Sequence, residues 1–289
     1  MKRRLCSKML AALLSLILIV SFLPTTVFAA ENNPTSLTIG NVVVDTSQTG
    51  YWTTDDSGVL TASDESNYNV YYDANGTLYL NNATISGVST TNYGAGIWFR
   101  GGDLVIYLEG NNKINASSNN GYSAGIFNSY DFQYGLTLTG GGSLDISSSD
   151  VDSSAYAIFI ANDITFDNVN ITASTGKANN TRNEVIRSEA GSIYIRNSTV
   201  YAESPDNETV LYSRGIMAGN GLEGISITIE NSTVTAIAGN ARSDSTAIES
   251  NDVNIKNSFV IADGQHYSIG VYDGVDFTDS LIHLTVRQD

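Results

Sequence analysis

The sequence predicts an all-β protein that folds as a right-handed parallel β-helix, a solenoid of about eight coils with an N-terminal cap. A short strand motif recurs along the chain, and a residue that tolerates left-handed backbone angles stands at a fixed place in each copy. From Ala30 onward no stretch has a sustained helical periodicity. Short alternating runs dominate instead, as in residues 104–108 and 225–229, and such runs are typical of strands with one buried face.

The recurring motif consists of a short strand, a turn that carries Asn, and a closing aliphatic residue. Residues 78–85 show it first, five later segments repeat it at the same length, and two others carry one extra residue in the turn. A period of this size indicates a solenoid, whereas a propeller blade needs ~40–45 residues. The closing aliphatics lie 22 to 34 residues apart, at Ile85, Ile114, Leu144, Ile171, Val200, Val234, Val260 and Ile282.

A second series of short strands falls between these motifs. Each contains a small residue followed by an aliphatic one, except for one copy that has Val185 followed by Ile186. Each repeat therefore holds two or three short strands separated by turns, as in one coil of a β-helix. The pairs are Gly96-Ile97, Gly125-Ile126, Ala157-Ile158, Gly215-Ile216, Ala247-Ile248 and Gly270-Val271.

The turn in each motif has a constant chemistry. Three residues before each closing aliphatic stands an Asn, Gly or Asp, residue types that tolerate left-handed backbone angles. Stacked coils would place the Asn side chains in register, where each amide can bond to its neighbours along the axis. The positions are Asn82, Asn111, Gly141, Asn168, Asn197, Asn231, Asn257 and Asp279.

The alternation within each strand also predicts the core. Outward positions are Thr137, Thr165, Tyr194, Thr228 and Asn254. The predicted inward side chains are Leu78, Leu80, Leu104, Ile106, Leu108, Leu136, Leu138, Ile164, Phe166, Ile193, Ile195, Ile227, Ile229, Val253, Ile255 and Phe277.

The chain divides into three predicted segments. Residues 1–29 resemble a signal peptide, with a basic start, an apolar run over residues 9–22 and cleavage expected after Ala29 or, as second choice, Ala30. The alternative, an uncleaved anchor, is disfavoured because the run is short for a ~30 Å hydrocarbon core. Residues 30–76 are expected to form the N-terminal cap, and residues 77–289 the β-helix repeats. The mature chain would contain no cysteine, because Cys6 is the only one.

Charge limits the classes of partner. The chain has 14 basic and 30 acidic residues, and four of the basic residues lie in the predicted signal peptide. We expect no nucleic-acid partner, since phosphate binding requires clustered Lys and Arg, and no integral membrane segment after signal cleavage. A polyanionic glycan would be repelled unless calcium bridged it.

Two segments carry a resemblance to a known class of proteins. Residues 75–87 read Asn-Gly-Thr-Leu-Tyr-Leu-Asn-Asn-Ala-Thr-Ile-Ser-Gly, and residues 102–112 read Gly-Asp-Leu-Val-Ile-Tyr-Leu-Glu-Gly-Asn-Asn. Both resemble the recurrent unit of Gram-positive secreted and surface right-handed parallel β-helix repeat proteins. The chain is in this respect similar to clostridial carbohydrate-binding β-helix proteins, and the resemblance implies glycan binding with bound calcium. It covers most of residues 70–289 and assigns no binding residue.

Catalysis is not predicted. Polygalacturonase-like proteins carry several Asp motifs together with Gly-His-Gly, whereas this chain offers only Asp55-Asp56, and neither His266 nor His283 lies in such a motif. Pairs of acidic residues, the minimum for glycosidase chemistry, are plentiful by chance in an acidic chain.

Binding through exposed aromatic side chains is the favoured interpretation, because sugar rings stack on flat aromatic faces. Trp98 and Phe99 are adjacent on one predicted strand, so one of them should face outward. The alternative is that outward tyrosines simply favour β-structure. The candidate ligand-binding residues are Trp98, Tyr107, Tyr130, Tyr134, Tyr194 and Tyr201.

A calcium site is the remaining candidate. Asp145, Asp150 and Asp152 lie close together in the sequence and could supply the oxygen ligands that a hard cation needs. The alternative is a solvated acidic surface. No cofactor other than calcium is expected.

The sequence thus predicts a secreted, extracellular protein, non-catalytic, that binds a polysaccharide or cell-wall glycan or mediates cell-surface adhesion. One alternative is a structural or assembly subunit, because the last coil, which includes residues 281–286, lacks an evident cap and could self-associate end to end. A polysaccharide lyase or glycoside hydrolase is the least favoured alternative.

Overall fold

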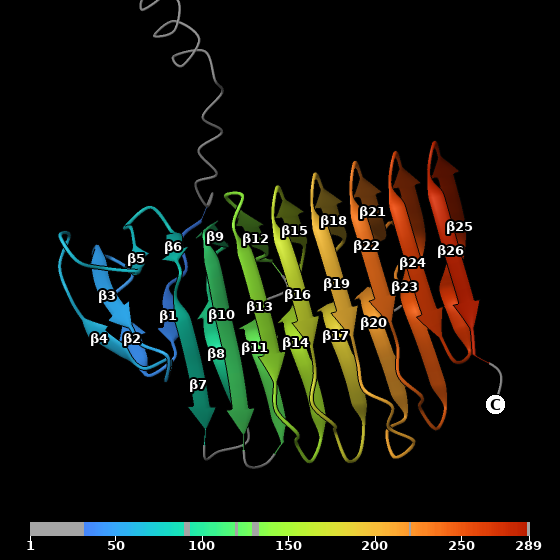
Figure 1. Ribbon diagram of the computed structural model, residues 1–289, viewed down its shortest axis with the longest axis horizontal. Coiled ribbons are helices and arrows are strands. Elements are labelled where there is room, and N and C mark those ends of the chain that lie inside the picture. The colour runs from blue at the N-terminus through green and yellow to red at the C-terminus, as the bar shows by residue number, and fades with distance from the viewer. Residues whose placement is uncertain (1–31, 90–92, 119–120, 129–132, 220, 288–289) are drawn as a thin grey trace, which may run out of the picture.

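The computed structural model describes residues 32–89, 93–118, 121–128, 133–219 and 221–287, and it contains strands but no helix within these ranges. Parallel strands wind into a right-handed β-helix, which confirms the predicted fold class (Figure 1). The number of turns is about six, and eight strands stack in one of the sheets, roughly consistent with the prediction of eight coils. The predicted signal peptide, residues 1–29, lies outside the described residues.

Each coil contributes one strand to each of three columns, in the order column 1, column 2, column 3, except that the last described coil has strands in columns 1 and 2 alone. Column 1 contains β6 (Thr77–Asn81), β9 (Leu104–Glu109), β12 (Leu136–Thr139), β15 (Ile164–Asp167), β18 (Ile193–Arg196), β21 (Ser226–Glu230) and the second halves of β23 (Asp244–Lys256) and β25 (Tyr267–Thr278). Column 2 contains β7 (Thr84–Ser89), β10 (Asn111–Ser118), β13 (Ser143–Ser148), β16 (Asn170–Ser174), β19 (Thr199–Glu203), β22 (Thr233–Ile237), β24 (Phe259–Gly264) and β26 (Leu281–Val286). Column 3 contains β8 (Tyr93–Arg100), β11 (Tyr122–Asn128), β14 (Ser154–Ile160), β17 (Arg182–Ser188), β20 (Tyr212–Ala218) and the first halves of β23 and β25.

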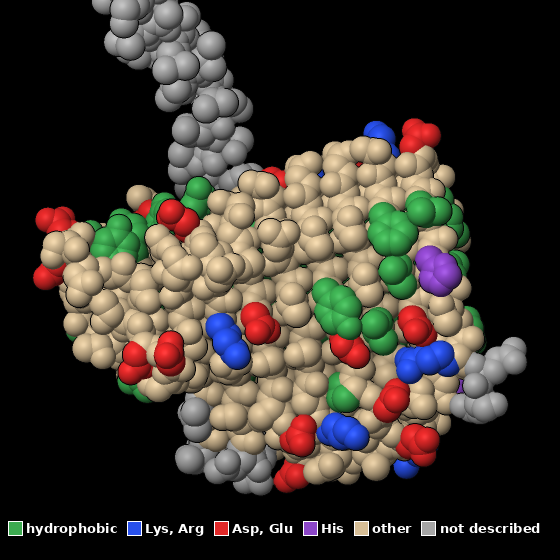
Figure 2. All heavy atoms as spheres, viewed as in Figure 1, with side chains coloured by type: hydrophobic (Ala, Val, Ile, Leu, Met, Phe, Trp, Pro, Cys, Tyr) green, Lys and Arg blue, Asp and Glu red, His purple; other side chains and the backbone are tan. Residues whose placement is uncertain are grey.

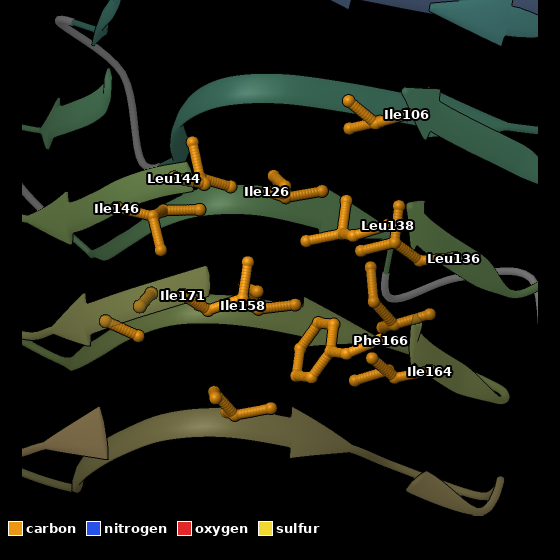
Figure 3. Close-up of a cluster of buried hydrophobic side chains, with 14 of the residues drawn as sticks. Ile106, Ile126, Leu136, Leu138, Leu144, Ile146, Ile158, Ile164, Phe166 and Ile171 are labelled. Atoms are coloured by element: carbon orange, nitrogen blue, oxygen red, sulfur yellow. The ribbon is translucent and has the colours of Figure 1, made fainter. Parts of the chain in front are cut away.

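The core runs along the axis between the three columns. Parallel pairing keeps equivalent residues in register, so that Ile126 pairs with Ile158 on column 3 and Leu136 with Ile164 on column 1. Their side chains point into a common interior, together with those of column 2 such as Ile146 (Figure 3). This burial of aliphatic surface is the main favourable term for folding.

The inward positions predicted from alternation are buried, with one exception. Phe277 pairs with the buried Ile255 on the preceding coil but is 43% exposed. No strand of the described chain stacks on its other side, so its inward face remains open to solvent. The predicted outward side chains are all partly or fully exposed.

Antiparallel strands cover the first coil. They are β1 (Ser36–Ile39), β2 (Val42–Val44), β3 (Gly50–Thr54), β4 (Leu60–Ala62) and β5 (Val70–Tyr72). β1 pairs with β8 of column 3 and β5 with β6 of column 1, so the first strands of these two columns have hydrogen-bonded partners on their outer edges. Paired edges are protected from strand addition.

The turns between columns 1 and 2 adopt left-handed angles, as predicted, with one correction. Six of the predicted positions, Asn82, Asn168, Asn197, Asn231, Asn257 and Asp279, have φ between 48° and 57°, and Gly141 has a φ of 87°. Asn111 does not, because the extra residue of that turn lets Gly110 take the left-handed position with a φ of 63°. The amide ladder forms in part, since Asn257 Nδ2 donates to Asn231 Oδ1 at 2.7 Å.

Candidate functional site

The strands of column 3 share a bend that makes their outward face concave. Pairing between β11 and β14 skips one residue in each strand, Gly125 and Ala157, and the equivalent position in β17 is Val185. Two consecutive residues point inward at this bend, so the side chains on either side of it converge on the outside. Glu184 and Arg187 show this, because they lie on either side of Val185 and Ile186 and are 2.5 Å apart. A concave strip, which we call the groove, therefore follows the helix axis along column 3. Buried side chains such as Phe127, Arg187 and Met217 fill its floor.

Aromatic side chains line the N-terminal half of this groove. The rings of Trp98, Phe127 and Phe159 form an edge-to-face ladder with centroids 5.9 and 5.6 Å apart. Tyr93 and Tyr122 stack beside them at 5.2 Å. The small side chains of Ala95 and Ala124 leave a shallow apolar hollow between these rings. The Trp98 indole Nε1 is buried and has no hydrogen-bond partner among the described residues.

Charged side chains replace the aromatic ones in the C-terminal half. Glu184 is fully buried and contacts three guanidinium groups, those of Arg187 at 2.5 Å, Arg214 at 3.3 Å and Arg182 at 3.6 Å. Burial by itself would raise the pKa of Glu184, but the three guanidinium charges outweigh it and hold the pKa below its usual value. Glu184 is therefore an ionised structural carboxylate.

The two halves meet without a break. The Arg187 guanidinium lies over the Phe159 ring, 5.7 Å from its centroid, which joins the aromatic ladder to the ionic network. Arg182 and Arg214 both lie against the Tyr212 ring, at 5.4 and 4.8 Å. The groove thus changes from an apolar to a polar lining along the axis.

A pocket of about 450 Å³ lies at the C-terminal end of the groove. Arg214 bonds to Glu249 and to Asp244, and the Tyr272 hydroxyl donates to Glu249 Oε1 at 3.0 Å. Burial and the Glu249 charge raise the pKa of Tyr272, so its phenol stays protonated. The pocket is lined by Asp244, Thr246, Glu249, Tyr267, Gly270 and Tyr272, among others.

The structure does not bring the sequence-predicted aromatic residues together. Trp98 lies in the groove and faces outward, while its neighbour Phe99 is buried, as expected for adjacent strand residues. Tyr107 and Tyr194 lie on column 1, and Tyr201 lies on column 2 with its hydroxyl 2.6 Å from Glu203 Oε2. Tyr134 precedes β12. Tyr130 lies outside the described residues.

Tyr107 belongs to a separate row of tyrosines. We call this row the tyrosine stripe; it runs over the cap and the outward face of column 1. Successive ring centroids in it lie 4.9 to 5.6 Å apart. Its members are Tyr51, Tyr68, Tyr71, Tyr79 and Tyr107.

The sequence reasoning missed most of the groove, although a signal was present. The residue directly after each of the first six pairs in the second strand series faces the groove. The pair Gly270-Val271 is out of register, because Ile248 pairs with Ile269. Along the axis the residues that face the groove at this position are Trp98, Phe127, Phe159, Arg187, Met217 and Glu249. Reading that position alone, coil by coil, would have shown the change from aromatic to charged lining.

The predicted calcium ligands are dispersed. Asp145 lies on β13 between Lys113 and Thr172 of the neighbouring coils. Asp150 Oδ1 accepts the Lys177 backbone N–H at 2.7 Å, and Asp152 Oδ1 accepts from Asn179. Within the described ranges no three or more His, Cys, Asp or Glu side chains are grouped so that they could hold a metal ion.

Fold and groove together define the chain as a parallel β-helix with an axial groove on one face. No family model, no curated protein and no solved structure matches the chain. Among the described residues there is also no helix with the length and apolar character needed to cross a membrane.

Proposed function

We propose that the protein is an extracellular, non-catalytic glycan-binding protein whose column 3 groove holds a linear polysaccharide along the helix axis. The aromatic ladder of Trp98, Phe127 and Phe159 supports this proposal most directly. It repeats one ring per coil at about the ~4.8 Å strand spacing, and the half-buried rings of Trp98 and Phe159 offer stacking positions on either side of the buried Phe127. A linear polymer with a regular repeat suits such a row better than a compact ligand does.

The polar half of the groove supports the same ligand class. Sugars present an apolar ring face and a rim of hydroxyl groups, and the groove offers rings at one end and guanidinium and carboxylate groups at the other. The excess of acidic residues favours a neutral or basic glycan over a polyanionic one. Column 2, on the face shown in Figure 2, carries uncharged polar side chains and isolated charges over its N-terminal strands, and hydrophobic side chains gather over its C-terminal strands.

The charges in the groove disfavour catalysis. A glycoside hydrolase needs a carboxylic acid that is protonated at working pH, and a raised pKa provides it. Three arginines hold the pKa of Glu184 low, in the opposite direction. A lyase that used Tyr272 as a base would need a lowered phenol pKa, whereas burial and Glu249 raise it.

Affinity measurements with neutral linear oligosaccharides of increasing length test the proposal. Affinity should rise with length until the groove is filled, and Trp98→Ala should lower it about tenfold, which corresponds to ~1.4 kcal/mol. Tyr194→Ala removes an outward tyrosine outside the groove and should leave affinity unchanged. Loss of binding in Tyr107→Ala but not in Trp98→Ala would move the site to the tyrosine stripe and refute the groove.

Self-association is a second candidate function, favoured by one observation. The last described coil exposes apolar side chains that in other coils are covered, including Val275, Phe277 and Leu284. A second copy stacked against this end would bury them and pair the free edges of β25 and β26. Sedimentation at increasing protein concentration should then show a dimer that Phe277→Asp abolishes, and a monomer at all concentrations would exclude it.

A further inference from the structure

We infer that the pocket at the C-terminal end of the groove binds a protonated amino group, and that the preferred glycan carries an amino sugar there. This inference rests on the proposed glycan-binding function and adds a chemical class to it. The pocket has about 450 Å³, within the ~300–1,000 Å³ usual for small-ligand sites. It can therefore accept one or two sugar units at the end of a chain that lies in the groove.

The balance of charge around the pocket favours a cation. Two carboxylates, Asp244 and Glu249, line it, and both pair with the same guanidinium, that of Arg214. Arg214 also contacts Glu184, so its single positive charge is divided among three carboxylates. The other two guanidinium groups at Glu184, those of Arg187 and Arg182, do not pair with Asp244 or Glu249. The pocket is left with an excess of negative charge.

The carboxylate oxygens retain capacity for a further donor. Asp244 Oδ1 accepts from Thr246 Oγ1 at 2.9 Å, and Oδ2 accepts from Arg214. Glu249 Oε2 accepts from Arg214 and Oε1 from the Tyr272 hydroxyl. A carboxylate has about four lone-pair sites, so each of these groups can accept an ammonium N–H as well. Such charge-assisted bonds are stronger than those to a neutral hydroxyl.

Two tyrosine rings complete the recognition of a cation. Tyr267 and Tyr272 are 59% and 63% exposed, and both line the pocket. Aromatic faces attract cations, and the same groove already places Arg182 and Arg214 against Tyr212. The hydrogen bond from Tyr272 to Glu249 fixes the position of that ring beside the carboxylate. An ammonium group would meet carboxylate oxygens and ring faces together, whereas an acetamido group lacks the charge and a uronate has the wrong sign.

Calorimetric titration with three oligosaccharides of equal length tests the inference. The probes are a deacetylated hexosamine oligomer, its N-acetylated form and a neutral hexose oligomer, in mildly acidic buffer that keeps the amine protonated. The wild-type protein should bind the deacetylated oligomer about tenfold more tightly than either of the others. Calcium chloride added as a separate titrant shows whether an inorganic cation takes the same pocket; if calcium competes fully at equimolar concentration, the amino-sugar preference is refuted.

Two variants locate the preference. Tyr267→Ala removes an exposed ring, and Asp244→Asn removes one negative charge while keeping the side-chain shape. Each should reduce the preference for the amine to about threefold or less, because affinity for the deacetylated oligomer should fall more than affinity for the neutral one. Tyr194→Ala, outside the groove, should retain the full preference. If Asp244→Asn fails to fold, Tyr267→Ala still tests the inference, because this substitution breaks no ion pair.

The outcomes separate the two proposals. Equal wild-type affinity for all three oligomers overturns the amino-sugar inference and leaves glycan binding in the groove intact. Absence of binding to any of the three overturns both. A preference for the amine that survives both Tyr267→Ala and Asp244→Asn overturns the assignment to this pocket.

Discussion

Tyr156 and Phe159 stack with ring centroids 4.6 Å apart and planes tilted by 23°. Residues three apart in a regular strand point to opposite faces, so this contact requires a break in the alternation. The break lies at Ala157 and Ile158, which both point into the core. It recurs in each strand of column 3 and creates the concave face on which the proposed binding site lies.

The bend at Gly125 depends on the size of its neighbours. A Cβ at Gly125 would lie 2.3 Å from Ile146 Cγ1, so Gly125→Ala should destabilise the protein by about 1–3 kcal/mol. The equivalent residues Ala157 and Val185 fit because Ala173 and Ala202 replace Ile146 in their coils. Urea unfolding measures the loss in free energy of unfolding that Gly125→Ala causes in the wild type and in an Ile146→Ala background. The loss should be smaller in the Ile146→Ala background. Strict additivity of the two changes would contradict this explanation.

Glu184 holds three arginines in the groove. Glu184→Gln leaves their buried charge poorly compensated and should lower the free energy of unfolding by about 3 kcal/mol. Glu230→Gln is the matched control, because it breaks a pair with Arg196 that is exposed on both sides, and it should cost less than about 1 kcal/mol. Equal effects in chemical denaturation would show that the buried network does not stabilise the fold.

The same carboxylate predicts a pH dependence. Glu184 has a pKa in the folded protein below its ordinary value of 4.5, so the unfolded chain binds a proton more readily. The stabilisation is therefore complete above about pH 4.5 and is lost as pH falls through the lower folded pKa. The stability difference between wild type and Glu184→Gln should shrink from pH 7 to pH 3. A difference that stays constant in urea titrations over this range would contradict the assignment.

Asn231 occupies a left-handed turn and also takes part in the amide ladder. Asn231→Ala should cost about 1–2 kcal/mol, because it places a Cβ-bearing residue without a polar side chain at a φ of 51° and removes the bond from Asn257. Asn231→Gly relieves the backbone strain but still removes the ladder bond, so its cost should be smaller. Thermal unfolding of both variants separates the backbone strain from the loss of the hydrogen bond. An Asn231→Gly variant as unstable as Asn231→Ala would show that backbone strain contributes nothing.

Several features of this fold follow from local sequence alone. Alternation with a period of two places Leu136, Ile164 and Ile193 in the core whatever surrounds them, because neighbouring strand residues face opposite sides. Asn82 and Asn231 identify left-handed turns, since few other residues adopt those angles without strain. The repeat of these signals determined the solenoid architecture and most of the core.

The stacking of coils on one another decided which side chains lie together. Glu184, Arg214 and Glu249 lie at least 30 residues apart in the chain and meet only because each coil rests on the one before it. Phe277 has the pattern of a core residue but is exposed, since burial depends on a neighbouring coil as well as on strand direction. The groove likewise arises from two consecutive inward residues that local alternation does not predict. Local chemistry determined which way each regular strand faces, and the contacts between coils determined which outward side chains came together as a site.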